Sequence, residues 1–295
     1  VELQRELHKE PHTDLAEALS NLGVVLSDLG EYHESETLYR EALQMKRVLL
    51  GDIHPEIALG LNNIAYALTD QKKYDEAASM YRQAIAMQHK LLGDDHPDIA
   101  AALNNLAFVL HDKGDAEGAR RMMQQSLDMY RRTVGPEHPS IARGMGNQAM
   151  WQMEAGDYAT AEPLLREALQ MRRKLLGNEH TDVAGTLTLL ASLLVETGRF
   201  EEGRSAAAEA RAICLPALGA AHWRTAAATS TEGAALAGLG QTAQGAKLLL
   251  EGLAVLQADV GALPFSVNNA ARWAAEYNLK RTGATQGAVF LLEDK

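Results

Sequence analysis

Apolar and small residues recur at steps of three and four along most of this chain, the spacing of one buried face of an α-helix. Residues 55–70 show the pattern clearly, with apolar or small positions at Ile57, Ala58, Leu61, Ile64, Ala65 and Leu68. A second run begins near Tyr74 and continues to Gly93. Helix formers dominate both runs and β-branched residues are few, so we expect two helices and no strands. Each helix has one apolar face, which must be buried on neighbouring helices.

This two-helix segment repeats with a fixed length. Histidine recurs every 42 residues, at His12, His54, His96, His138, His180 and His222. Proline follows at Pro55, Pro97 and Pro139, where it suits the first position of a helix. We therefore expect each histidine to close the loop between repeats and to cap the first helix. Glycine ends the first helix in most repeats by permitting a positive φ, with Lys72 as the exception.

The period predicts one elongated domain made of stacked repeats. The repeats span 12–53, 54–95, 96–137, 138–179, 180–221 and a degenerate 222–263. Residues 1–11 match the end of a second helix, because residues 3–7 align with residues 45–49. Residues 264–295 should form a truncated repeat and cap, with a helix near 265–280 and a stub ending Phe290-Leu291-Leu292. The partial first repeat and the missing initiator Met suggest a piece of a longer chain.

Composition narrows the classes of function. The net charge of −11 and pI near 5.4 argue against nucleic-acid binding, which needs clustered Lys and Arg. The longest apolar run, residues 187–195, is far shorter than the roughly 20 residues of a membrane span. A single cysteine, Cys214, rules out an internal disulfide and is compatible with a reducing compartment. We therefore expect a cytoplasmic protein with no membrane or nucleic-acid partner.

No pattern of a catalytic or metal site is present. The sequence lacks a phosphate-binding loop, a His-Glu-x-x-His segment and a cysteine pair. Equivalent histidines in stacked helices would lie about 10 Å apart, whereas two imidazoles on one zinc must lie within about 4 Å of each other. We expect no catalytic residue, no metal and no cofactor, so this chain should not be an enzyme by itself.

Several segments resemble a known repeat family. Leu61-Asn62-Asn63-Ile64-Ala65, Glu76-Ala77 and Met80-Tyr81-Arg82-Gln83-Ala84 resemble a tetratricopeptide repeat, and the period with Gly-Asp-x-His-Pro resembles the kinesin light chain subclass. The resemblance is strong over residues 12–200 and fades after them. It implies an all-α fold, an α-solenoid in which antiparallel helix pairs stack into a right-handed superhelix. It also implies that the first helices line a concave groove that binds a peptide or a helical segment of a partner.

The face of the first helix opposite its core offers an amide, an apolar or aromatic residue and an acid in each of the first four repeats. The family implies that the second Asn of the motif contacts bound peptides; an Asn side chain could pair with an extended peptide backbone. The same amide could instead tie neighbouring repeats together. The family also implies a cation on the second helix, used for acidic peptides, although a repeated acid leaves the partner's charge open. The predicted peptide-binding residues are Asn21, Asn62, Asn63, Tyr66, Asn104, Asn105, Phe108, Arg143, Asn147, Met150, Lys46 and Arg172.

These observations favour a protein-interaction scaffold. A second hypothesis is a regulatory or oligomerising segment of a larger signalling enzyme, such as a bacterial Ser/Thr kinase or an NTPase. A third is a structural spacer that binds no peptide. Nothing in the sequence demands a dimer, so we expect a monomer.

Overall fold

The computed structural model describes residues 2, 10–259 and 261–277. Within them the chain forms helices α2 to α14 and no strand, which confirms the all-α prediction. The helices are α2 (Thr13–Asp28), α3 (Tyr32–Leu50), α4 (Pro55–Asp70), α5 (Tyr74–Leu92), α6 (Pro97–Asp112), α7 (Ala116–Val134), α8 (Pro139–Glu154), α9 (Tyr158–Leu176), α10 (Thr181–Glu196), α11 (Phe200–Leu218), α12 (Trp223–Gly238), α13 (Thr242–Ala258) and α14 (Pro264–Glu276).

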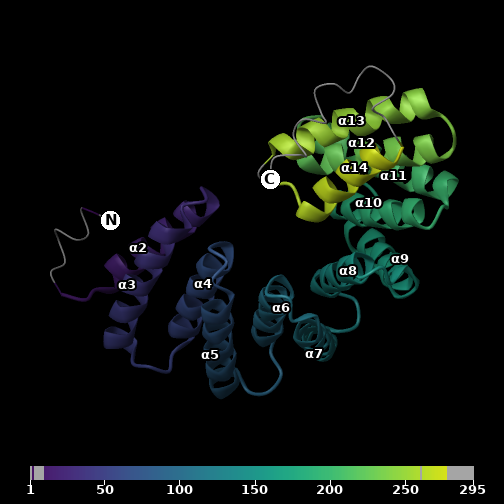
Figure 1. Ribbon diagram of the computed structural model, residues 1–295. Coiled ribbons are helices and arrows are strands. Elements are labelled where there is room, and N and C mark those ends of the chain that lie inside the picture. The colour runs from purple at the N-terminus through teal and green to yellow at the C-terminus, as the bar shows by residue number, and fades with distance from the viewer. Residues whose placement is uncertain (1, 3–9, 260, 278–295) are drawn as a thin grey trace. The chain divides into compact units, whose positions relative to one another are not determined.

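The chain divides into two compact units. The N-terminal unit, residues 1–138, contains α2 to α7, and the C-terminal unit, residues 139–295, contains α8 to α14. In each unit the helices stack in consecutive pairs (Figure 1). The second helix of one pair also contacts the first helix of the next, as α3 contacts α4 and α9 contacts α10. This arrangement is the predicted α-solenoid.

The helix ends follow the predicted local chemistry. The ring of His54 accepts a hydrogen bond from the backbone N–H of Glu56 at 3.2 Å, and the ring of His96 accepts one from Asp98 at the same distance. These bonds satisfy donors that a helix N-terminus leaves unpaired. Lys72 has a φ of 60°, the left-handed value that glycine takes at the equivalent places. The predicted capping role of the repeated histidine is therefore confirmed at these helices.

Replacing His96 by alanine should remove the cap of α6 and lower the free energy of unfolding by about 1 kcal/mol. Asparagine is among the best N-cap residues, so His96→Asn should retain most of the stability. Urea unfolding followed by circular dichroism measures both variants. Equal losses for alanine and asparagine would show that the histidine acts through something other than its cap.

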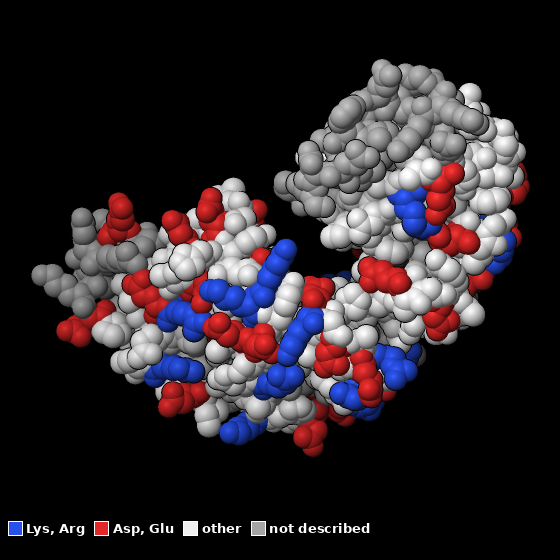
Figure 2. Space-filling view, viewed as in Figure 1, with Lys and Arg blue, Asp and Glu red and all other residues white. Residues whose placement is uncertain are grey.

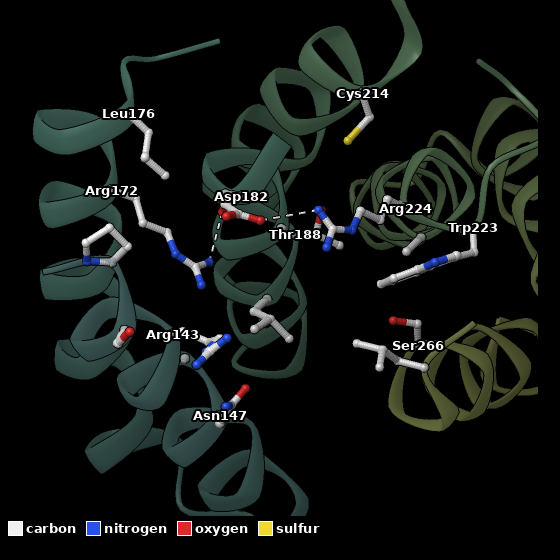
Figure 3. A pocket seen from close by; sticks show the side chains of 17 residues that line it. Arg143, Asn147, Arg172, Leu176, Asp182, Thr188, Cys214, Trp223, Arg224 and Ser266 are labelled. Atoms are coloured by element: carbon white, nitrogen blue, oxygen red, sulfur yellow. Dashed lines mark hydrogen bonds and ion pairs between the residues drawn. The ribbon is translucent and has the colours of Figure 1, made fainter. Parts of the chain in front are cut away.

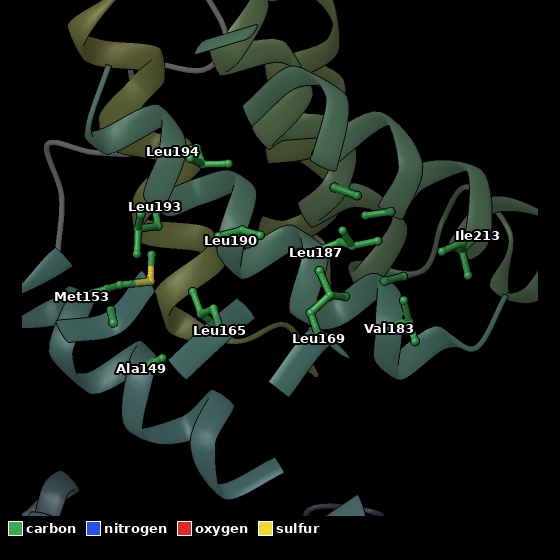
Figure 4. Close-up of a cluster of buried hydrophobic side chains, with 14 of the residues drawn as sticks. Ala149, Met153, Leu165, Leu169, Val183, Leu187, Leu190, Leu193, Leu194 and Ile213 are labelled. Carbon is green, nitrogen blue, oxygen red and sulfur yellow. The ribbon is translucent and has the colours of Figure 1, made fainter. Parts of the chain in front are cut away.

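The core of the C-terminal unit surrounds α10. Leu187, Leu190, Leu193 and Leu194 are buried, and they pack with side chains of α8, α9 and α11 (Figure 4). Because α10 contacts the helices on both sides of it, its sequence is apolar around most of its circumference. A continuous core of this kind explains why a single repeat would not be stable alone.

The last helices pack closely. Gly233 in α12 and Gly245 in α13 leave no room for a side chain, because an added Cβ would lie 2.4 Å from the backbone N of Leu249 and 2.6 Å from that of Ala237, respectively. The ring of Trp273 in α14 is 2% exposed, and its Nε1 donates to Glu196 Oε1 at 2.6 Å. This bond ties α14 to α10.

Two predictions concern residues outside the described ones. The alignment of residues 3–7 with the end of a second helix lies there, and so does the stub Phe290-Leu291-Leu292. The expected helix near 265–280 corresponds to α14, Pro264–Glu276. Among the described residues, no helix combines the length and the hydropathy that crossing a membrane requires.

Candidate binding pockets

A pocket of about 400 Å³ lies within the C-terminal unit (Figure 3). We name it the arginine pocket after its charged lining residues, Arg143, Arg172, Arg224 and the single acid Asp182. Most of its wall comes from the first helices of successive pairs, α8, α10 and α12. The other lining residues are Pro139, Ser140, Gly146, Asn147, Leu176, Gly185, Thr188, Leu189, Cys214, Trp223, Ala227, Leu263 and Ser266.

Arg172 is held by hydrogen bonds across the helix pair. Its guanidinium donates to the backbone oxygen of Asp182 at 2.9 Å and to Thr186 Oγ1 at 2.6 Å. Burial lowers the pKa of Arg172, and repulsion from Arg224 and Arg143 adds to this against the attraction of Asp182. Burial is the largest cause, so the lowered pKa chiefly reflects the removal of the Arg172 guanidinium from water.

Arg224 approaches the same acid from the other side. Its guanidinium lies 3.4 Å from Asp182 Oδ1 and over the ring of Trp223, 5.4 Å from the centroid. Figure 3 shows Asp182 between the guanidinium groups of Arg172 and Arg224. Asp182 therefore contacts both arginines, Arg172 through its backbone oxygen and Arg224 through its carboxylate.

Arg143 makes no such contact with a described residue. It lies on α8 one turn before Asn147, and both residues line the pocket. Its side chain makes no hydrogen bond or ion pair with any residue that the structure describes, and its guanidinium faces the same space as that of Arg172 (Figure 3). The pocket thus holds three guanidinium groups, one carboxylate and unused donors, which is an environment for an anion.

A second pocket, of about 360 Å³, lies within the N-terminal unit between α4, α5 and α6. We name it the amide pocket after Asn62 and Gln88, whose side-chain oxygens are buried without a hydrogen-bond partner. Gln88 is 7% exposed. Asp98 and Glu56 also line this pocket, and no Lys or Arg does among the described residues.

The predicted cation Lys46 pairs with an acid within the fold. It is buried on α3, and its Nζ donates to Glu56 Oε2 at 2.8 Å. Gln88, Tyr130, Arg172 and Cys214 occupy the equivalent place in later repeats. Of these later equivalents of Lys46, Arg172 is a cation, and it lines the arginine pocket.

The predicted asparagines occupy different environments although their spacing is regular. Asn104 is buried and donates to Asn105 Oδ1 at 3.3 Å. The Asn105 side chain also hydrogen-bonds the hydroxyl of Tyr81 in the preceding repeat, and Tyr81 is buried enough that its pKa is raised. The Asn105 amide therefore ties α5 to α6. Asn62 and Asn105 line the amide pocket, and Asn147 lines the arginine pocket.

The remaining predicted residues lie outside both pockets. Asn21 is exposed on α2, and Asn63 is half-buried on α4. The Tyr66 ring is 50% exposed, and its hydroxyl hydrogen-bonds Asp70, whose pKa is raised by burial and by the charge of Asp112. Phe108 and Met150 are half-buried.

The sequence prediction missed Trp223 and Arg224. A signal for Arg224 was present, because the equivalent positions of the earlier repeats hold Asp14, Glu56, Asp98, Ser140 and Asp182. Four of these five positions are acidic, so a basic residue there is a break in the period. Among the described residues, no group of three or more His, Cys, Asp or Glu side chains could hold a metal ion.

Comparisons with known proteins agree with this architecture. A family model described as tetratricopeptide repeat matches residues 14–90, 56–132 and 98–174. The kinesin light chain repeats of Podosopora anserina are 22% identical, with a TM-score of 0.59 over 70% of this chain and 98% of theirs. BtubC (BKLC) from P. vanneervenii is 17% identical, with a TM-score of 0.63 over 80% and 92%. PilF of Pseudomonas aeruginosa is 17% identical, with a TM-score of 0.56 over 89% and 98%. No curated protein matches the sequence.

Proposed function

We propose, because the chain belongs to the tetratricopeptide repeat family, that it binds a peptide segment of a partner protein and holds an acidic side chain of that segment in the arginine pocket. Arrays of this family are generally non-catalytic scaffolds for protein interactions. The observation that carries the finer proposal is that Arg143, Arg172 and Arg224 line one pocket in which Asp182 is the single acid.

The arginines can bind a carboxylate by hydrogen bonds as well as by charge. A guanidinium presents parallel N–H donors that match the two oxygens of a carboxylate. The N–H donors of Arg143 make no hydrogen bond with a described residue. Arg172 and Arg224 are positioned by Asp182. An incoming carboxylate therefore meets oriented donors and neutralises repulsion between the cations.

The rest of the lining suits the apolar part of a peptide. Trp223, Leu189 and Leu263 present apolar surface, and Asn147 offers a donor and an acceptor for a peptide backbone. A nucleic acid is disfavoured as the source of the anion, because residues 139–295 carry 14 basic and 16 acidic side chains, a formal net charge of −2. Such a surface would repel an extended phosphate backbone.

Changing Arg143 to glutamine tests the pocket with little risk to the fold, since Arg143 is exposed and bonds no described residue. The probe is a heptapeptide with blocked termini and one central glutamate flanked by leucines. Its affinity for Arg143→Gln should fall about tenfold, the loss of one hydrogen bond to a charged group. Isothermal titration calorimetry on the full chain measures the change.

Arg166→Gln is the matched control. Arg166 lies on α9, pairs with Glu162 and does not line the pocket. Its loss should leave the affinity for the glutamate peptide unchanged. If Arg143→Gln binds the peptide as tightly as the control does, the acid does not bind at the arginine pocket.

A further inference from the structure

The amide pocket contains a polar group that the fold does not satisfy. Gln88 is more than nine-tenths buried, its side-chain oxygen has no hydrogen-bond partner, and it makes no side-chain hydrogen bond with any described residue. The side-chain oxygen of Asn62, on the facing helix α4, is also buried and unpaired. Folded proteins rarely leave buried acceptors unpaired. Two such oxygens lining one pocket point to a donor supplied from outside.

Comparison with the preceding repeat shows which donor fits. There Lys46 occupies the position of Gln88 and places its ammonium 2.8 Å from Glu56. In the next repeat the acid is kept, as Asp98, but the lysine is replaced by the shorter, neutral Gln88. Asp98 has no Lys or Arg partner among the described residues. The site therefore has a carboxylate and acceptors but lacks a cation.

The ring of His96 does not serve as the cation for Asp98. Its Nδ1 lies 3.6 Å from Asp98 Oδ2, but this nitrogen accepts the backbone N–H of Asp98 at 3.2 Å. A ring nitrogen that accepts a hydrogen bond carries no proton to share with the carboxylate. The carboxylate of Asp98 remains open to a ligand.

The shape of the amide pocket and the charge of the unit around it also suit a cationic side chain. Leu59, Leu91 and Ala101 line the pocket and suit an aliphatic stem. Residues 1–138 carry 23 acidic and 14 basic side chains, a formal net charge of −9, and side chains of both signs are interspersed over the visible face of this unit (Figure 2). This unit therefore attracts basic segments, in contrast to the nearly neutral residues 139–295.

We propose that the amide pocket binds the side-chain ammonium of a lysine on a partner protein. The ammonium has three N–H donors and no acceptor, which matches the oxygens of Asn62, Gln88 and Asp98. The bound lysine would replace the intramolecular cation that Lys46 provides one repeat earlier. This inference concerns a pocket of the N-terminal unit and does not depend on what the arginine pocket binds.

The test uses three heptapeptides with blocked termini, identical except for lysine, norleucine or glutamate at the centre. Each is titrated into the full chain while NMR follows the side-chain amide signals of Gln88 and, for the arginine pocket, of Asn147. The lysine peptide should shift the Gln88 signal and bind at least tenfold more tightly there than the norleucine peptide. Comparable binding of norleucine, or a Gln88 response to the glutamate peptide, would overturn the proposal.

Substitutions separate binding from folding. Gln88→Lys should supply the missing cation from within, pair with Asp98 as Lys46 pairs with Glu56, and reduce lysine-peptide binding at least tenfold in a folded chain. Asp98→Asn should reduce the same binding without adding a charge. Gln83→Lys is the control, because Gln83 is exposed on the same helix and does not line the pocket.

Unchanged lysine-peptide affinity in both Gln88→Lys and Asp98→Asn would overturn the assignment. Arg143→Gln should bind the lysine peptide as the unchanged chain does. A failure of the arginine pocket to bind acids is thereby distinguished from a failure of the amide pocket to bind lysine.

Discussion

Gly233→Ala is expected to lower the free energy of unfolding of the C-terminal unit by about 3 kcal/mol, the upper range for overpacking a core. The added Cβ would lie 2.4 Å from the backbone N of Leu249 and 2.7 Å from the backbone O of Gly245. Both contacts are with backbone, so relief requires α12 and α13 to separate. Trp151, Trp223 and Trp273 all lie in this unit, and tryptophan fluorescence during urea unfolding therefore reports its stability directly.

Gly146→Ala is the matched control in the same unit. Gly146 is also helical, on α8, but an added Cβ there would meet nothing within 4 Å. Alanine should therefore stabilise the helix by about 0.5–1 kcal/mol through its higher helix propensity. Opposite signs for the two substitutions support close packing of α12 on α13. A loss at Gly146 as large as that at Gly233 would contradict it.

Changing Arg143 and Arg224 together to glutamine should produce the largest effect on binding. Each removes a charged hydrogen-bond donor, and losing two at about 1.5 kcal/mol each corresponds to roughly a hundredfold weaker binding of the glutamate peptide. The Arg224 ion pair with Asp182 is partly exposed, so the unfolding free energy should change by less than about 1 kcal/mol. Calorimetric titration with both single variants completes a double-mutant cycle.

The two single variants test whether the arginines act on one ligand group. If both arginines bind the carboxylate of the peptide, each single variant should bind the glutamate peptide less tightly, and the double variant should bind it less tightly than either single variant. No loss of affinity in the double variant would rule out the arginine pocket as the site of the acid.

The periodic features of the fold were predictable from the sequence because they depend on local chemistry. The helix from Pro55 to Asp70 and the next from Tyr74 to Leu92 have the expected bounds. Lys72, which interrupts the series of glycines, adopts the positive φ that its position requires. A helix end is decided by a few adjacent residues, and such residues are visible in the sequence.

The pockets were less predictable because they depend on contacts between repeats. Asn62 and Asn104 hold the same place in successive repeats, yet Asn104 donates to Asn105 while the side-chain oxygen of Asn62 has no hydrogen-bond partner among the described residues. Arg143 and Arg172 were among the predicted residues, but their meeting with Arg224 depends on the packing of α12. Trp223 and Arg224 lie in the degenerate sixth repeat, where the period alone indicates little about side-chain chemistry.

Exchanging one residue of the peptide tests most directly whether the arginine pocket binds an acidic side chain. The affinity of the full chain for the heptapeptide with a central glutamate is compared with that for the same peptide carrying glutamine, which has the same shape without the charge. The three arginines that line this pocket predict at least a tenfold preference for glutamate, with shifts of the Asn147 side-chain amide signal on binding. Equal affinities for the two peptides would contradict the account.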